Sequence, residues 1–338
     1  MKRYGSFFEK AVDFNNLVLA AKKAAKGKEL TIQAQDFLFR LEPNIIEIQK
    51  ELLSEEYIPR PYRTFMVHDP KQRLISSAHF RDRVVHHSIC AVLEPVFESI
   101  SIYDSYACRK NKGSHKAIKK ARKYLKNNEY YLKNDIDKFF ASVDHSVLKY
   151  FLRRKVKDSK MNMLIDTLID HPVPGCVYGK GLPIGNLTSQ HFANFYLGEL
   201  DHFIKERLRI KGYIRYMDDF ILFGNSKKML NNAHKEIKEY LLSVLKLKIK
   251  DSQTMLAPAN TGLSFLGFRI FRNLIRIQQK GFRRFKRKVL RRINEYDNGY
   301  IDELKFEQSL SSLVSHIKTA NTYRIRQKFF ENQVLGQE

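Results

Sequence analysis

The stretch YIRYMDDFILF, residues 213–223, places two adjacent carboxylates between two short apolar runs. Each run has the length and the Tyr, Ile and Phe content of a β-strand, and Met217-Asp218 as the link leaves a loop of only two residues. Such loops normally carry Asn or Gly where a positive φ is needed, so Met and Asp predict a strained turn that is kept for a site. Asp is also common in solvated surface turns, so the rest of the chain has to decide between the two interpretations.

The composition of the chain indicates what kind of molecule it binds. The 338 residues carry 61 Lys and Arg against 36 Asp and Glu, a formal charge of +25, and 43% hydrophobic residues predict a globular chain with subdomains. A polyanion is the natural partner, and nucleic acid is favoured over a membrane because no run approaches the roughly 20 apolar residues of a spanning helix. The three cysteines lack CxxC spacing, so neither a disulfide framework nor a zinc site is expected, and a cytoplasmic location is predicted.

Helical and extended patterns alternate in the first half of the chain. The apolar spacing from about residue 5 to 55 predicts two helices, and the segment 57–77 predicts a basic hairpin of two short strands. Helical spacing returns over 80–97. A basic loop then precedes another helix, whose apolar face lies within 117–125.

The second half predicts a sheet. Residues 130–140 have the pattern of a strand, on which Asp135 and Asp137 lie two apart and hence on one face. The order β-α-α-β-β-α-β from 130 to 256 predicts an α+β sheet with helices on one side. Its remaining elements are helices from residue 146, over 192–208 and over 229–245, and a basic extended segment at 246–256. A single hairpin turning at Arg272-Asn273 is predicted over 263–277.

Residues 281–294, GFRRFKRKVLRRIN, predict an amphipathic helix with an apolar stripe of Phe282, Phe285, Val289 and Ile293. Seven cations in fourteen residues without an acid repel one another unless a polyanion neutralises them, which predicts contact with nucleic acid. The same contact is predicted for two cations of the basic loop. The full set is Arg109, Lys112, Arg283, Arg284, Lys286, Arg287, Lys288, Arg291 and Arg292.

A strand bearing Asp135 beside a hairpin bearing Asp218 and Asp219 brings three carboxylates together, and such a cluster stays ionised only beside hard cations. Two Mg²⁺ ions about 3.5 to 4 Å apart, with Mn²⁺ as a substitute, would clamp an attacking 3'-hydroxyl and a leaving pyrophosphate, as nucleotidyl transfer requires. Lys71, Arg73 and Arg81, upstream in the chain, are the cations predicted to neutralise a triphosphate.

The sequence resembles the reverse transcriptases through nearly its whole length. Six blocks follow one another in the family's order, which is far more specific than an isolated YMDD. They are KQRLISSAHFRDRVVHHSI and SYACRKNKGSHKAI of the fingers, NDIDKFFASVDH of motif A, GLPIGNLTSQHFANFYLGELD of motif B, YIRYMDD of motif C and LSFLGFRI of motif E. The resemblance implies a right-hand polymerase fold with fingers at 1–127, a palm at 128–277 with a helical insertion at about 150–185, and a thumb at 278–338.

The resemblance also implies roles for the acids and for the residues around them. Asp135, and not Asp137 or Asp144, would be the metal ligand of motif A, followed by the carbonyl of Ile136. Asp218 would be the second bridging ligand and Asp219 its companion.

Phe140 falls at the family's sugar-gate position, where a ring would collide with a ribose 2'-hydroxyl, so deoxynucleotides should be selected. Either Phe139 or Phe140 is also expected to be a core residue at the strand end. Among the cations of the fingers, Arg73 is preferred over Lys71 as a triphosphate ligand, although the hairpin is rich in cations.

Motif B departs from most reverse transcriptases, which have Gln-Gly followed by Ser-Pro. Here the pattern is Ile184-Gly185-Asn186-Leu187-Thr188-Ser189-Gln190, which is similar to the enzymes of diversity-generating retroelements. Ile184, Gly185 and Gln190 are expected to border the nucleotide. An apolar Ile184 cannot hydrogen-bond the substrate or template as an amide does, so looser positioning and lower fidelity are expected.

The subtype implies a bacterial or phage-encoded enzyme that copies a template-repeat RNA into cDNA with misincorporation at adenines, for targeted mutagenic retrohoming. Its implied partners are template RNA, primer, deoxynucleoside triphosphates and a small basic accessory oligomer. One alternative is another bacterial reverse transcriptase, of phage-defence, retron or group II intron-like type. The other is a non-catalytic RNA-binding protein, against which the three intact acids argue.

Overall fold

The computed structural model describes residues 4–68 and 72–334. Its N-terminal region is helical, with α1 (Phe8–Val12), α2 (Phe14–Ala25), α3 (Ile32–Phe39) and α4 (Leu41–Leu53) packed around the long α5 (Phe80–Ile100). The two helices expected before residue 55 are therefore four. One break is at Asp13, whose side chain accepts a hydrogen bond from the Asn16 amide and begins α2, and another follows Gly27, which has φ +73°.

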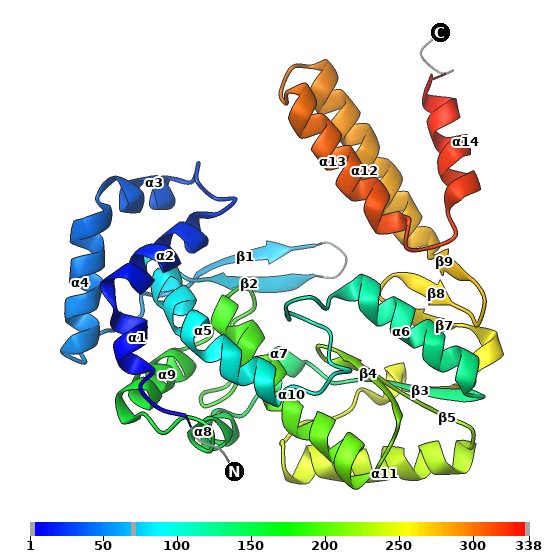
Figure 1. The fold of residues 1–338 in the computed structure, drawn as a ribbon, viewed down its shortest axis with the longest axis horizontal. Helices are drawn as coiled ribbons and strands as arrows, with labels where there is room; N and C mark the ends of the chain where they lie inside the picture. The colour runs from blue at the N-terminus through cyan, green and yellow to red at the C-terminus, as the bar shows by residue number, and fades with distance from the viewer. Residues whose placement is uncertain (1–3, 69–71, 335–338) are drawn as a thin grey trace.

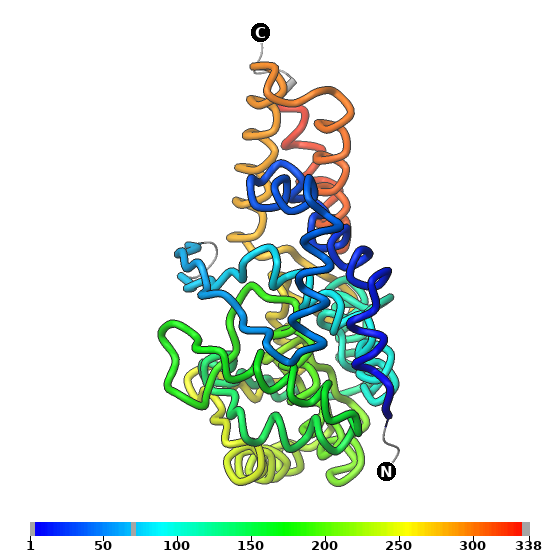
Figure 2. The backbone as a smooth tube through the Cα atoms, turned by 90° about the vertical axis from the view of Figure 1, so that its left-hand side faces the viewer, coloured from blue at the N-terminus to red at the C-terminus, as the bar shows by residue number. Residues whose placement is uncertain are grey.

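The predicted basic hairpin is confirmed as the antiparallel pair β1 (Arg63–Val67) and β2 (Arg73–Ser77). It projects from the body of the molecule, to the left in Figure 2. Lys71, between the two strands in the sequence, lies outside the described residues.

The central sheet has four antiparallel strands in the order β4-β5-β3-β6. They are β3 (Tyr130–Asp135), β4 (Gly212–Tyr216), β5 (Asp219–Gly224) and β6 (Met255–Pro258). Successive residues of β3 enter different cores, because Leu132 packs with the helices of one face and Tyr131 with the other face. The sheet is thus buried on both sides.

One face of the sheet carries the helices that separate its strands, and the other carries a helix and a small sheet (Figure 1). The first group is α8 (His145–Arg153), α9 (Ser159–Asp170), α10 (Leu187–His202) with a π-helical continuation η1 (Phe203–Arg207), and α11 (Lys227–Ser243). The second is α6 (Ser114–Asn127) with β7 (Leu263–Phe265), β8 (Phe268–Ile270) and β9 (Ile275–Ile277).

Three details differ from the sequence-based expectations. The strand at 130–140 ends at Asp135, because Lys138 has φ 42° and begins the short α7 (Phe139–Ser142), so Asp137 lies in a turn and not on the face of Asp135. The segment 246–256 is a loop with a 3₁₀ turn (η2, Asp251–Gln253) before β6. The single hairpin at 263–277 is a three-stranded meander with an additional two-residue turn at Leu266-Gly267.

The C-terminal region is a three-helix unit that rises beyond the small sheet (Figure 1). It consists of α12 (Gln279–Asp297), α13 (Glu303–Ile317) and α14 (Tyr323–Val334). The predicted stripe of α12 is confirmed, since Phe285 and Val289 are buried against Ile317 and Phe329. No described helix is long and apolar enough to cross a bilayer.

His86 of α5 makes stability sensitive to acid. It is 3% exposed, and its Nδ1 has no hydrogen-bond partner among the described residues. Burial lowers the pKa of His86 to about 3, with His87, Arg83 and His171 adding to the shift. Below about pH 6.5 the imidazole of His86 takes up a proton in the unfolded chain but not in the folded chain. Acidification below that pH therefore lowers the free energy of unfolding, by up to about 1.4 kcal/mol per pH unit.

We therefore expect His86→Leu to reduce the pH dependence of unfolding between pH 6.5 and 5. Urea unfolding of the two proteins at three pH values measures this. Parallel pH profiles would contradict the assignment.

Candidate active site

The acidic hairpin has the tight geometry that its sequence predicts. Tyr216 pairs with Asp219 at the end of the β4–β5 ladder, which leaves Met217 and Asp218 as the link. Met217 has φ 58°, a left-handed conformation that costs a non-glycine residue about 1 to 3 kcal/mol and persists only where the surrounding structure imposes it. The prediction of a strained turn is confirmed.

A buried arginine holds this turn in place. Arg215 is 1% exposed, and its guanidinium binds both carboxylate oxygens of Asp201 at 2.7 and 2.6 Å. It also donates to Asn194 Oδ1 at 3.0 Å and to the Met217 carbonyl at 3.2 Å. Asp201 and Asn194 both belong to α10, so the arginine connects the motif B helix with the acidic turn.

The sheet register brings the predicted acids together. Asp135 is directly opposite Asp219 in the β3–β5 ladder, and Asp218 immediately precedes Asp219 at the turn. Burial raises the pKa of Asp219 to about 6. Lys133 opposes that shift, whereas the charges of Asp135 and Asp218 add to it. The acids therefore repel one another, and a bound cation would relieve that repulsion.

The donors present suit a hard divalent cation. Among the described residues, no three Asp, Glu, His or Cys side chains are gathered closely enough to hold a metal without other ligands. Mg²⁺ seldom needs such a cage, because it commonly binds one or two carboxylates together with substrate phosphates and water. Asp219 Oδ1 is buried without a hydrogen-bond partner, which is the kind of oxygen such an ion satisfies.

The motif B loop lies against the β1–β2 hairpin. The Ile184 carbonyl accepts a hydrogen bond from the Ser76 amide at 2.9 Å, and the Ile184 side chain is half-buried. Gly185 has φ 117°, and a Cβ there would lie 2.9 Å from Ile75 Cγ2, so a larger residue would not fit. Gln190 accepts a hydrogen bond from the Cys108 thiol at 3.3 Å.

The two phenylalanines after β3 have different environments. Phe139 is 2% exposed and belongs to the core, which confirms that one of the pair is a core residue. Phe140 is half-buried, and its carbonyl accepts a hydrogen bond from the Leu182 amide at 2.7 Å. Phe140 is thereby held next to the segment that leads into motif B.

Two of the cations predicted to bind phosphates, Arg73 and Arg81, differ in their exposure to solvent. Arg73 is exposed on β2. Arg81 is 7% exposed and pairs with Glu51, so contact with a triphosphate would require that ion pair to open.

The basic-loop cations also have partners within the protein. Arg109 pairs with Glu98 at 2.6 Å and donates to the Ser105 carbonyl, and Lys112 donates to the Tyr103 carbonyl.

Exposed cations cover most of the polar surface of α12. Glu295, the residue after the acid-free stretch 281–294, binds Arg291 at 2.8 Å and also pairs with Arg292. The polar side of α6 also carries exposed lysines that were not among the cations predicted to contact nucleic acid, namely Lys116, Lys119, Lys123 and Lys126. The absence of any acid in that helix was the signal that could have indicated them.

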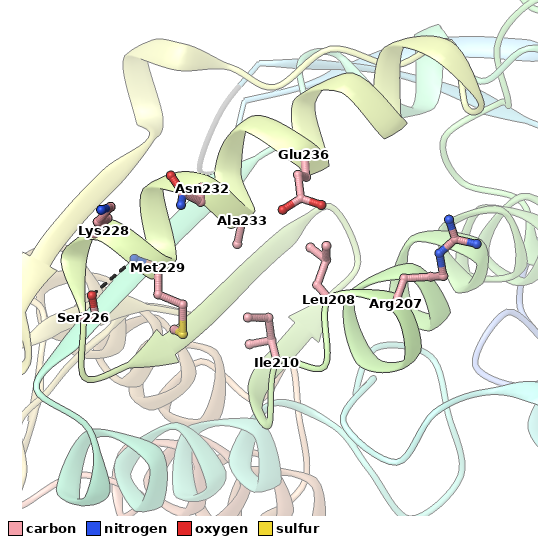
Figure 3. Close-up of a pocket in the computed structure, with 9 residues that line it drawn as sticks. All are labelled: Arg207, Leu208, Ile210, Ser226, Lys228, Met229, Asn232, Ala233 and Glu236. Carbon is pink, nitrogen blue, oxygen red and sulfur yellow. Dashed lines mark hydrogen bonds between the residues drawn. The ribbon is translucent and has the colours of Figure 1, made fainter.

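An open groove of about 510 Å³ lies away from the acids, between η1 and α11 (Figure 3). Leu208, Ile210 and Met229 contribute apolar surface, while Lys228 and Glu236 lie on its α11 side. It forms at the end of β5 that leads into α11, opposite to the end with Asp219, so it is not part of the acid site.

Comparison with known proteins identifies the class. The profile of the family "Reverse transcriptase (RNA-dependent DNA polymerase)" matches residues 67–270, which include the hairpin, the three acids and motif B. The chain belongs to this family, and it is an RNA-directed DNA polymerase with the α+β right-hand fold. Reverse transcriptases use divalent metal ions and nucleic-acid templates.

The relatives include a protein encoded by a group II intron. It is 25% identical over 277 residues to Protein YkfC of Escherichia coli K12, covering 69% of this chain and 72% of YkfC. It is 22% identical over 298 residues to the group II intron-encoded protein LtrA of Lactococcus lactis, covering 68% of this chain and half of LtrA. Telomerase from Candida albicans, solved with a fragment of telomeric RNA, shares the fold with a TM-score of 0.50 at 13% identity, over 87% of this chain and 58% of that chain.

Proposed function

We propose that the chain copies a template-repeat RNA into cDNA with errors at adenines, as the polymerase of a diversity-generating retroelement. The feature that carries the subtype is motif B, in which Ile184 precedes Gly185 where most reverse transcriptases are expected to have Gln. The hydrogen bond from the Ser76 amide fixes the main chain of Ile184. In this proposal, fidelity therefore depends on the contacts that the Ile184 side chain makes with the nascent base pair. An apolar group there supplies no hydrogen bond to a template or substrate base.

The proposed chemistry assigns each acid a role. Asp135, the Ile136 carbonyl and Asp218 hold two divalent cations, Mg²⁺ or Mn²⁺, and Asp219 assists them. When bound, such ions activate the primer 3'-hydroxyl and stabilise the leaving pyrophosphate. Arg73 neutralises the triphosphate, with Lys71 and Arg81 as further candidates, and Gly185 and Gln190 border the nucleotide.

The proposed organisation keeps three domains: fingers at 1–127, a palm at 128–277 with its helical insertion at about 150–185, and a thumb at 278–338. The cations of α12 would follow the backbone of the template and primer, because their charges repel one another without a polyanion. A small basic accessory oligomer completes the proposed system.

Phe140 supports selection of deoxynucleotides. We expect Phe140→Ala to lower the preference for deoxynucleotides over ribonucleotides about 10- to 100-fold, because the ring that meets the 2'-hydroxyl is removed. Single-nucleotide incorporation with each type of substrate measures the ratio. Phe139→Leu is the matched control, and it should lower stability while leaving the ratio unchanged. A ratio unchanged in Phe140→Ala would reject the sugar-gate role.

Ile184 supports low fidelity. We expect Ile184→Gln to reduce misincorporation opposite template adenines about three- to tenfold, which is the range of one hydrogen bond. Sequencing of cDNA made on one RNA template gives the rate for each base. Val177→Gln, a similar exchange at a residue that is 73% exposed, should leave the rates unchanged. Equal error spectra for the Ile184 variant and the parent would remove the proposed role of this side chain.

The resemblance to LtrA favours a second candidate, a group II intron-like reverse transcriptase without a diversifying role. The DNA beside the gene distinguishes the two. A near-identical repeat pair that differs at adenines is expected for the diversity-generating type, whereas its absence would favour the second candidate.

A further inference from the structure

Lys133 lies at the junction of the acid site and the small sheet. It precedes Asp135 by two residues on β3, so both side chains are on the same face. Its Nζ is 3.0 Å from Asp219 Oδ2 and donates to the Ser264 carbonyl of β7 at 3.1 Å. One ammonium group thus connects an acid of the hairpin with the strand that begins motif E.

Two residues of the same β3 face connect it to the segment that contains β7. The Tyr131 hydroxyl donates to the Gly262 carbonyl at 3.1 Å, immediately before β7, and Lys133 reaches Ser264 within it. The Tyr131 contact does not involve an acid, whereas the Lys133 contact does. The position of Asp219 relative to the small sheet therefore depends on Lys133.

The ion pair also divides the two oxygens of Asp219. Oδ2 is bound to the Lys133 ammonium, while Oδ1 is buried without a partner. The side chains of Lys133 and Asp219 are 23% and 22% exposed, so their interaction is only partly screened by solvent. A fixed cation at this place neutralises part of the negative charge that would otherwise attract a metal ion.

We propose that Lys133 is a positioning residue with two effects. It fixes Asp219 relative to β7, and it lowers the affinity of the acid site for divalent cations by occupying one oxygen of Asp219. Asp135 and Asp218 then remain as the main metal-binding acids. The inference rests on the proposed assignment of these acids as metal ligands.

The test measures metal binding separately from catalysis. Mn²⁺ binding to the full chain without nucleic acid is followed by electron paramagnetic resonance for the parent, Lys133→Met, Lys133→Arg and Lys228→Met. Removing a unit charge next to the acids should tighten Mn²⁺ binding about fivefold in Lys133→Met. Lys133→Arg keeps the charge and should bind like the parent. Lys228→Met removes an exposed lysine beside the distant groove of Figure 3 and should also bind like the parent.

Primer extension at saturating metal supplies the second readout. Lys133→Met should be about tenfold slower than the parent despite binding metal more tightly, because Asp219 loses its fixed position. A merely structural role would slow extension without tightening metal binding, and unchanged or weaker Mn²⁺ binding in Lys133→Met would overturn the proposal. If Lys133→Met does not fold, Lys133→Gln, which keeps a donor for Ser264 without the charge, provides the same comparison. A parent that binds Mn²⁺ with this dependence on Lys133 but makes no DNA would count against the proposed function and not against the role of Lys133.

Discussion

Asp218→Asn is expected to abolish DNA synthesis, with a fall in rate of at least about 1,000-fold. The exchange removes a full negative charge from the hairpin while preserving the shape of the side chain. Metal ions held by such acids supply several kcal/mol of transition-state stabilisation, and each step of about 1.4 kcal/mol corresponds to a tenfold change in rate. Extension of a primer on an RNA template under single-turnover conditions measures the loss. The same fall is expected for Asp135→Asn, because Asp135 lies in register with the hairpin.

Asp137→Asn is the matched control for these two variants. Asp137 lies in the turn after β3, only two residues from Asp135, yet it is not on the strand that faces the hairpin. Its rate should stay within about threefold of the parent, because a shift of that size corresponds to well under 1 kcal/mol. A severe loss in Asp137→Asn together with a mild one in Asp135→Asn would reverse the assignment of the motif A acid.

Arg215→Met is expected to destabilise the fold by about 3 to 5 kcal/mol, because it leaves the Asp201 carboxylate buried without its countercharge. Tyr213, whose hydroxyl donates to Asp201 at 2.7 Å, cannot replace that charge. The Met217 carbonyl also loses its donor, so the acidic turn should become less ordered. Urea unfolding monitored by circular dichroism measures the loss.

A double-mutant cycle separates the ion pair from general disruption. Arg215→Met combined with Asp201→Leu should be less destabilised than Arg215→Met alone, because no unpaired charge then remains buried. Arg207→Met, an exposed arginine of η1, should change stability by no more than about 0.5 kcal/mol. If the double variant were as unstable as the sum of the two single variants, the buried pair would not have the coupling described.

Local signals in the sequence were sufficient for much of the fold. The β4–β5 hairpin, α5, α6 and α12 follow from apolar periodicity over a continuous stretch, and the structure confirms each of them. The meander at β7–β9 was missed because Leu266-Gly267 lacks the Asn-Gly or Asp-Gly pattern of a two-residue turn. The early end of β3 depends on the left-handed conformation of Lys138, a residue type that does not signal it.

Some contacts of the candidate site could likewise be predicted from the sequence, and others could not. The approach of Asp135 to the acidic hairpin could be predicted, because two strand patterns carried the acids and the motif order supplied the pairing. The contacts of Lys133 with Asp219 and of Arg215 with Asp201 could not be predicted, since each joins residues of different elements. A lysine or arginine within a strand suggests a solvated position, and only the tertiary structure shows its buried partner.

Primer extension on a defined RNA template, with deoxynucleotides and Mg²⁺, tests the central claim most directly. The parent protein should make DNA whose sequence complements the template, and chelation of the metal or the Asp218→Asn exchange should stop it. Absence of product from the folded parent, or undiminished product from Asp218→Asn, would contradict the assignment of this hairpin as the catalytic centre of an RNA-directed DNA polymerase.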